Sequence, residues 1–141
     1  MIASFSGEYR FLSNFYVAEV WYEGVRYRSS EHAFQAAKTL CTAERAKVAA
    51  AKGPGEAKRL GRCLSLRHDW EDIKVDVMRA VVRDKFMRHA DLREKLLATG
   101  SQVLVEGNSW GDKVWGVCKG KGTNWLGRVL MEVRGELQGG V

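Results

Sequence analysis

Helix-start residues recur along this chain, each followed by apolar residues at helical spacing, and this succession constrains the fold more than any other feature. Serine, threonine, aspartate and asparagine cap helix N-termini, and proline suits the first helical position. The predicted helices begin at Ser29 or Ser30, Thr42, Pro54, Asp69, Asp91 and Asn124, and they end near Leu40, Gly53, Arg62, His89, Gly100 and Leu137. Short strands are predicted over residues 20–22 and 25–27, around a Glu23-Gly24 turn, and over 102–106. We therefore predict an α+β fold, a mostly helical single domain with a few short strands that spans residues 1–141.

Length and composition exclude several classes of protein. The chain has 141 residues, of which 45% are hydrophobic and 28% charged, as in ordinary soluble domains. It contains no apolar run of membrane-spanning length, and its N-terminus lacks the basic start and apolar core of a signal peptide. The cysteines Cys41, Cys63 and Cys118 form no Cys-x-x-Cys pair, and the three histidines are widely separated, so neither a disulfide framework nor a metal site is expected. We expect a cytoplasmic protein that does not bind membranes.

The whole net charge of +6 falls between Arg45 and Arg67. That window holds seven basic residues and one acidic residue, whereas the remainder of the chain carries 16 of each. Such a concentration favours binding of phosphate groups, either in a nucleic acid or in a single nucleotide. The alternative is a solvated helical face without a ligand.

Glu31, Gln35 and Lys38 are spaced i, i+4 and i+7 in the helix predicted from Ser30, so they share one face. The opposite side is predicted to enter the core with Ala33, Phe34, Ala37, Leu40 and Cys41. A carboxylate near an amine offers an acid/base pair, or a nucleophilic lysine with its proton shuttle. The alternative is an exposed polar face with an ion pair. His32 lies off both faces and is expected to be a hydrogen-bonding spacer.

The segment 106–116 combines acidic side chains, amides and two tryptophans, Trp110 and Trp115. Aromatic rings beside carboxylates and amides suit a flat heterocycle, because the ring stacks while the polar groups bind its edge. Either tryptophan can instead fill the core. Residues 119–124 then lead into a helix N-terminus, where backbone amides and two lysines can hold a phosphate.

Several strings follow one another along nearly the whole chain. They include Leu12-Ser13-Asn14-Phe15, Ser30-Glu31-His32-Ala33-Phe34-Gln35-Ala36-Ala37-Lys38, Ala57-Lys58-Arg59-Leu60-Gly61-Arg62, Leu104-Val105-Glu106, Trp115-Gly116 and Gly122-Thr123-Asn124-Trp125-Leu126-Gly127. In this order they resemble the NADAR (NAD and ADP-ribose related) superfamily, in particular its YbiA-like N-glycosidases. The resemblance implies the YbiA-like fold and hydrolysis of the bond between a ribose and an amino group on a heterocycle, with no cofactor and no metal.

Two classes of small-molecule nucleotide substrate follow from the resemblance. One is the phosphorylated ribosylamino-pyrimidine intermediates of riboflavin biosynthesis, and the other is ADP-ribose attached to guanine, including guanine carried in DNA or RNA. Glu31 and Lys38 are then the predicted catalytic residues. In the first mechanism, Lys38 is the nucleophile or an electrostatic partner, and Glu31 is the proton shuttle. In the second, Glu31 activates a water molecule that Lys38 orients.

The resemblance also implies a set of substrate-binding residues. Trp115 is expected to stack on the base, Asp112 to bind a base amine or a ribose hydroxyl, and the two arginines to face the phosphate. The full set is Ser13, Asn14, Arg59, Arg62, Glu106, Asp112, Trp115, Gly116 and Asn124.

A different class of function is also compatible with the residues. The basic window and the five tryptophans suit a non-catalytic module that binds ADP-ribose, another nucleotide or nucleic acid. A non-catalytic module of this kind would have no function for the paired Glu31 and Lys38.

Overall fold

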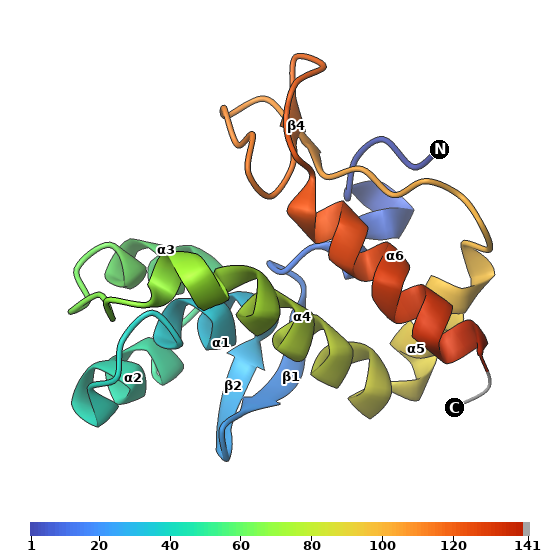
Figure 1. Ribbon diagram of the computed structural model, residues 1–141. Coiled ribbons are helices and arrows are strands. Elements are labelled where there is room, and N and C mark those ends of the chain that lie inside the picture. The colour runs from blue at the N-terminus through green and yellow to red at the C-terminus, as the bar shows by residue number, and fades with distance from the viewer. Residues whose placement is uncertain (140–141) are drawn as a thin grey trace. The chain divides into compact units, whose positions relative to one another are not determined.

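The computed structural model describes residues 1–139 and confirms an α+β fold that is mostly helical with a few short strands (Figure 1). The described chain divides into two compact units, and we describe each by itself. The hairpin unit comprises residues 14–88, and the terminal unit comprises residues 1–13 and 89–139. Residues 140 and 141 of the predicted domain lie outside the described residues.

The predicted hairpin is present in the hairpin unit. Strand β1 (Val17–Tyr22) pairs antiparallel with β2 (Val25–Ser29), with Val20 opposite Tyr27. Glu23 and Gly24 both adopt positive φ, 48° and 80°, as a two-residue turn matched to strand twist requires.

Four helices complete the hairpin unit: α1 (Ser30–Ala36), α2 (Thr42–Ala49), α3 (Pro54–Gly61) and α4 (Trp70–Arg88). Helix α1 packs against the other three helices and both strands, so it is the centre of this unit. The Ser29 hydroxyl caps α1 by accepting the N–H of His32. Phe34 on α1 meets Trp70 on α4 edge to face, with ring centroids 5.1 Å apart.

The prediction that this helix reaches Leu40 is wrong. Helix α1 ends at Ala36, so Leu40 is 62% exposed and Cys41, also predicted to be in the core, is exposed. The chain turns away because distant groups bind its carbonyls. The Arg67 N–H donates to the Lys38 carbonyl at 2.8 Å, and the Arg45 side chain donates to that of Thr39 at 2.7 Å.

Two other helix ends also differ from the prediction. Cys41, not Thr42, occupies the N-cap position of α2, and this helix ends at Ala49 rather than at Gly53. Gly53 instead precedes α3, in which Pro54 is the first residue as predicted.

The terminal unit contains a 3₁₀-helix, η1 (Gly7–Leu12), and the helices α5 (Ala90–Ala98) and α6 (Trp125–Gln138), which pack together. His89, rather than the predicted Asp91, holds the N-cap position of α5. After α5, Gly100 adopts the predicted left-handed conformation, with φ of 63°. The buried guanidinium of Arg134 on α6 donates to the Thr99 hydroxyl at 2.9 Å and so ties the two helices together.

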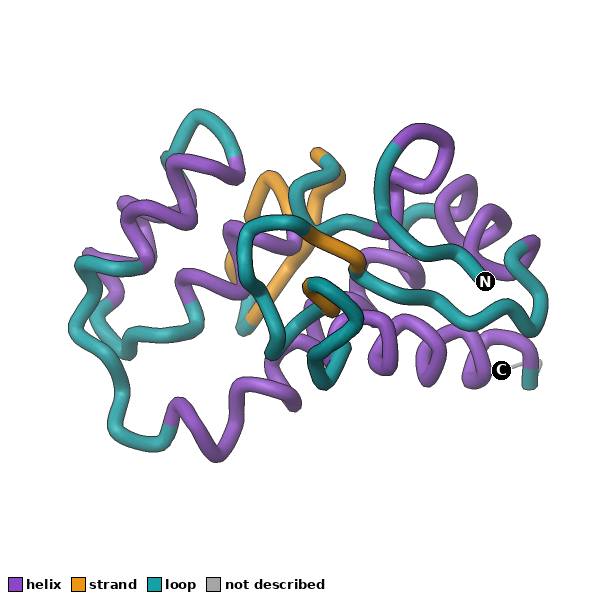
Figure 2. The backbone as a smooth tube through the Cα atoms, turned by 90° about the horizontal axis from the view of Figure 1, so that it is seen from above, coloured by secondary structure: helices purple, strands orange, loops and turns teal. Residues whose placement is uncertain are grey.

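The strand predicted over residues 102–106 is also wrong. Leu104 forms only an isolated parallel bridge with Ile2, because the N-terminal segment then turns into η1 and the ladder cannot extend. The strands of this region are β3 (Gly107–Asn108) and β4 (Val117–Cys118), a parallel pair within an otherwise irregular segment before α6 (Figure 2). None of the helices among the described residues combines the length and the apolar character that crossing a bilayer requires.

Candidate active site

Glu31 and Gln35 lie on successive turns of α1 in the hairpin unit, and both are buried. Glu31 is 8% exposed and Gln35 is 4% exposed. The Gln35 side-chain N–H donates to the Glu31 carboxylate over 2.6 Å. The alternative of an exposed polar face with an ion pair is therefore wrong for these two residues.

Asn14 fixes the first turn of α1. Its backbone carbonyl accepts the N–H of Glu31 at 3.2 Å, and its side-chain oxygen accepts the hydroxyl of Ser30 at 2.8 Å. The Asn14 amide in turn donates to the sulfur of Met78 at 3.2 Å. Asn14 thus positions the segment that carries Glu31, whereas its contact with substrate stays a prediction.

Lys38 lies two residues beyond the end of α1 and is half-buried. Its backbone is held at both polar groups, since its N–H donates to the Gln35 carbonyl and its carbonyl accepts the N–H of Arg67. The Lys38 amine lies 6.0 Å from the centroid of the Phe34 ring. The charge of the Glu31 carboxylate acts on this amine, so the two groups lie in the same part of the unit.

The Lys38 amine has an unusual electrostatic environment. Burial lowers the pKa of Lys38, the nearby Glu31 carboxylate acts in the opposite direction, and the positive charges of Lys58 and Arg62 lower the pKa further. A lowered pKa increases the neutral fraction of a lysine, and the neutral amine is the nucleophilic form.

The basic residues near Lys38 come from α3 and its C-cap. Lys58 and Arg62 are spaced i, i+4, and the Lys58 amine lies 5.9 Å from the centroid of the half-exposed Phe15 ring. Arg59 is exposed and is not among the charges that act on the pKa of Lys38. Sequence reasoning missed Lys58, because no local signal shows which face of α3 packs on α1.

His32 is fully buried, with both ring nitrogens engaged. Its Nδ1 lies 2.6 Å from the Ser29 hydroxyl, and its Nε2 lies 3.1 Å from the Ala51 carbonyl. Because a carbonyl only accepts, the ring carries its hydrogen on Nε2 and accepts the serine hydroxyl at Nδ1. Burial lowers the pKa of His32. The predicted role of hydrogen-bonding spacer is confirmed.

In the terminal unit, Asn108 organises the loop that carries the predicted base-binding residues. Its amide donates to the Asp112 carbonyl at 2.8 Å and accepts the Asp112 N–H at 3.0 Å. The Asp112 carboxylate then accepts the N–H groups of Val114 and Trp115, at 3.1 and 2.9 Å. Trp115 is half-buried in this turn, whereas Trp110 is 66% exposed.

Glu106, Gly116 and Asn124 meet in the same unit. The Asn124 side chain accepts the Glu106 N–H at 3.0 Å and donates to the Leu104 carbonyl at 2.9 Å. Asn124 precedes α6 in a left-handed conformation without capping it, contrary to the prediction. A Cβ on Gly116 would lie 2.1 Å from the Glu106 carbonyl oxygen, so only glycine fits there.

The N-terminus of α6 does not present the free amides predicted for phosphate binding. Its first two N–H groups, from Trp125 and Leu126, already donate to the carbonyls of Val114 and Trp115. That prediction is wrong because the preceding loop folds back onto the helix.

The predicted site residues therefore fall into two groups. The hairpin unit holds Asn14, Glu31, Lys38, Arg59 and Arg62, and the terminal unit holds Ser13, Glu106, Asp112, Trp115, Gly116 and Asn124. Ser13 ends η1, where its N–H donates to the Arg10 carbonyl at 2.9 Å.

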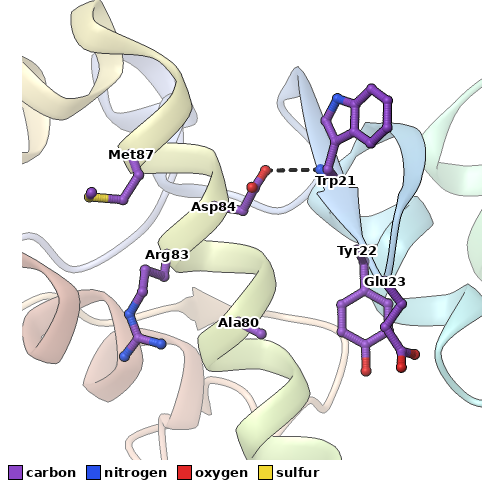
Figure 3. Close-up of a pocket in the computed structure, with 7 residues that line it drawn as sticks. All are labelled: Trp21, Tyr22, Glu23, Ala80, Arg83, Asp84 and Met87. Atoms are coloured by element: carbon purple, nitrogen blue, oxygen red, sulfur yellow. Dashed lines mark hydrogen bonds between the residues drawn. The ribbon is translucent and has the colours of Figure 1, made fainter.

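A separate hollow of about 470 Å³ lies between α4 and the hairpin (Figure 3). Among the described residues that line it, none belongs to the predicted site: they are Trp21, Tyr22, Glu23, Ala80, Arg83, Asp84 and Met87. The Asp84 carboxylate accepts the N–H of Trp21 at 2.9 Å and pairs with Arg88, so α4 covers the edge of β1. Within residues 1–139, no group of three or more His, Cys, Asp and Glu side chains is placed to hold a metal ion.

Comparison with known proteins identifies the family. The model of the NADAR domain matches residues 4–138. The chain belongs to the NADAR domain family. It is 42% identical to N-glycosidase YbiA of Escherichia coli (strain K12) over 137 residues, which cover 95% of this chain and 85% of that protein. An N-glycosidase of Nostoc punctiforme is 41% identical over 136 residues, 92% of this chain and 86% of that protein.

A third NADAR relative is a riboflavin biosynthesis protein of Vibrio vulnificus, 45% identical over 131 residues. The match covers 91% of this chain but only 35% of that longer protein. The NMR structure of the E. coli protein YbiA superposes with a TM-score of 0.86 at 41% identity, and covers 97% of this chain and 83% of that one. These comparisons confirm the predicted family, fold and enzyme class, N-glycosidase.

Proposed function

We propose that this chain hydrolyses the bond between C1 of a phosphorylated ribose and an exocyclic amino group of a pyrimidine. The observation that carries the proposal is the Lys38 amine, whose pKa is lowered by burial and by nearby cations while the buried Glu31 carboxylate lies close enough to oppose the shift. A lysine whose pKa is lowered, next to a carboxylate able to move protons, suits carbonyl-type chemistry at C1.

The reaction proceeds through the open form of the ribosylamine. The ring oxygen leaves C1 and takes a proton, which leaves a C=N bond between C1 and the nitrogen on the heterocycle. The neutral Lys38 amine adds to C1, and Glu31 carries the two protons of that amine, one after the other, to the leaving nitrogen. The heterocycle then departs as a free amine, while a C=N bond forms between Lys38 and C1. Water then adds to the C=N bond between Lys38 and C1, and this releases the ribose phosphate as an aldehyde and regenerates the lysine.

The second mechanism, in which Glu31 activates water and Lys38 orients it, has less support. A charged ammonium is the better orienting group, and burial lowers the pKa of Lys38, which disfavours that form. We therefore assign Lys38 the role of nucleophile and Glu31 that of proton shuttle.

Basic side chains near Lys38 are suited to the substrate phosphate. Lys58 on α3 and Arg62 at the C-cap of this helix are spaced i, i+4, and both charges act on the Lys38 amine. A phosphate bound by them would hold C1 near the nucleophile. We also propose Arg59 as a ligand of this phosphate, and Asp112 and Trp115 as the base-recognition residues.

The names of the relatives support the choice of substrate. Two are called N-glycosidases, and a third is called a riboflavin biosynthesis protein. ADP-ribose on guanine, free or in DNA or RNA, contains the same kind of bond between ribose and an exocyclic amine, and it is the second arm of the test.

The test is release of the free heterocyclic amine from a ribosylamino-pyrimidine phosphate and, separately, from ADP-ribosylated guanosine. We expect turnover of the first substrate, loss of turnover in Lys38→Ala and Glu31→Gln, and wild-type rates in Lys47→Ala, an exposed lysine on α2. Turnover of only the guanosine substrate would reassign the base. Turnover of neither by the folded protein would refute the proposal.

A further inference from the structure

We propose that Gln35 is a positioning residue for the Glu31 carboxylate, and that Gly61 on α3 keeps the Gln35 amide in the orientation this task requires. The inference rests on the proposed function only in giving Glu31 a proton-transfer role. The contacts that support it lie entirely within the hairpin unit.

The Gln35 amide has one orientation compatible with its surroundings. Its nitrogen donates to Oε2 of Glu31 at 2.6 Å. Turning the amide over would bring its oxygen against that carboxylate oxygen, and two acceptors repel. The hydrogen bond with Glu31 therefore requires the Gln35 amide nitrogen to face the Glu31 carboxylate and the Gln35 amide oxygen to face away from it.

The other half of the amide is left without a partner. Within residues 1–139, Oε1 of Gln35 is a buried side-chain oxygen with no hydrogen bond. Burying an unsatisfied carbonyl costs free energy, and an apolar side chain of the same length would avoid that cost. The Gln35 amide thus packs less favourably than an apolar side chain would, but it can donate a hydrogen bond to Glu31, which an apolar side chain cannot.

Gly61 provides the space for this arrangement. A Cβ at position 61 would lie 1.9 Å from Oε1 of Gln35 and 2.7 Å from its amide carbon. Any other residue at this position must push the amide away or separate α3 from α1. Gly55, on the same helix, offers a matched control, because a Cβ there meets no atom within 4 Å.

The position of the Glu31 carboxylate matters twice for the chemistry. A hydrogen bond to the ionised form stabilises that form and fixes which oxygen receives the proton. The same carboxylate acts on the pKa of Lys38. Losing the Gln35 donor should therefore change the titration of Glu31 first, and that of Lys38 as a consequence.

The test compares Gln35→Met, Gly61→Ala and Gly55→Ala with the wild type by NMR titration of the Glu31 carboxyl carbon. We expect the Glu31 midpoint to move to higher pH in Gln35→Met and in Gly61→Ala, and to stay unchanged in Gly55→Ala. In the pH–rate profile, the limb that Glu31 controls should move in the same direction, and kcat should fall about tenfold while KM changes little.

The titration needs no turnover, so it separates this inference from the proposed function. A folded Gln35→Met protein with the wild-type Glu31 midpoint would overturn the inference even if the enzyme is active. Equal shifts in Gly61→Ala and Gly55→Ala would overturn the role of Gly61. If either Gln35→Met or Gly61→Ala fails to fold, the other still decides whether the amide controls Glu31.

Discussion

At the scale of single residues, the surroundings of the Lys38 amine determine its pKa. Burial and the charges of Lys58 and Arg62 lower its pKa, and Glu31 opposes them. We predict that Lys58→Gln raises the pKa of Lys38, because it removes one of the cations that lower it. Less of the amine is then neutral near pH 7, so its reaction with an amine-selective reagent should slow, and NMR titration of the Lys38 side chain should report the higher midpoint.

Arg59→Gln is the matched control, since it removes one positive charge from the same helix. Arg59 is exposed and is not among the charges that shift the pKa of Lys38, so this variant should change the titration of Lys38 much less than Lys58→Gln does. If the two variants shift Lys38 equally, the effect is one of net charge, and the specific role of Lys58 is wrong.

His32 should make the stability of the fold depend on pH. Burial lowers its pKa in the folded protein, so below the ordinary histidine value of about 6.5 the unfolded chain binds a proton that the folded one does not. The contribution of His32 to the free energy of unfolding is complete above that pH. It is lost as the pH falls, by at most about 1.4 kcal/mol per pH unit. Urea unfolding at pH 7.5 and 5.5 measures this loss.

Between pH 7.5 and 5.5, the free energy of unfolding should decrease less in His32→Asn than in the wild type, whatever the stability of the variant at pH 7.5. The hydroxyl of Ser29 and the carbonyl of Ala51 bind the neutral ring, and protonation of Nδ1 removes the acceptor that the Ser29 hydroxyl uses. A variant that loses as much stability on acidification as the wild type would show that other groups are responsible.

At the scale of elements, the loop between β3 and α6 depends on the Asn108 amide. Asn108→Ala removes its hydrogen bonds with the backbone of Asp112, and buried or half-buried groups left unsatisfied cost about 1–3 kcal/mol each. We predict faster hydrogen exchange at the Asp112 N–H and a lower kcat/KM. Ser109→Ala, at the exposed neighbouring position, should change neither, and exchange at the wild-type rate in Asn108→Ala would contradict this account.

Local signals predicted most of the elements. The Glu23-Gly24 turn, Pro54 at the start of α3 and Gly100 after α5 each act through their own backbone conformation, so the sequence reveals them directly. Two of the failures depend on residues that are distant in the sequence. The end of α1 is set by donors from Arg45 and Arg67, and the missing strand at 102–106 by the short reach of the N-terminal segment.

In the candidate site, too, local spacing was predictable from the sequence, whereas contacts between helices were not. Helical spacing placed Glu31 and Gln35 on one face, and the structure joins them by a hydrogen bond. The string around Arg59 and Arg62 did not reveal that Lys58 is the second cation near Lys38, because that depends on which face of α3 packs on α1. Nor did periodicity predict that Gly61 accommodates the Gln35 amide.

At the scale of the whole molecule, the basic window of residues 45–67 is only partly available to ligands. Arg45 pairs with Glu23, and Arg67 pairs with Asp69. If Lys58 and Arg62 bind a single phosphate, KM for the phosphorylated substrate should rise only modestly with salt. A dephosphorylated substrate should show a higher KM that salt hardly changes. A nucleic-acid-binding module would instead lose duplex affinity steeply, with a slope set by the number of phosphates contacted, and that result would favour the non-catalytic alternative.

Reductive trapping tests most directly whether Lys38 attacks C1 of a ribosylamine. Sodium cyanoborohydride added during turnover of the ribosylamino-pyrimidine phosphate reduces the C=N bond between the lysine and the sugar. Mass spectrometry should then find the reduced ribose phosphate on the peptide that contains Lys38, and on no peptide of Lys38→Ala. Turnover without an adduct at Lys38, together with a wild-type rate in Lys38→Arg, would contradict the account.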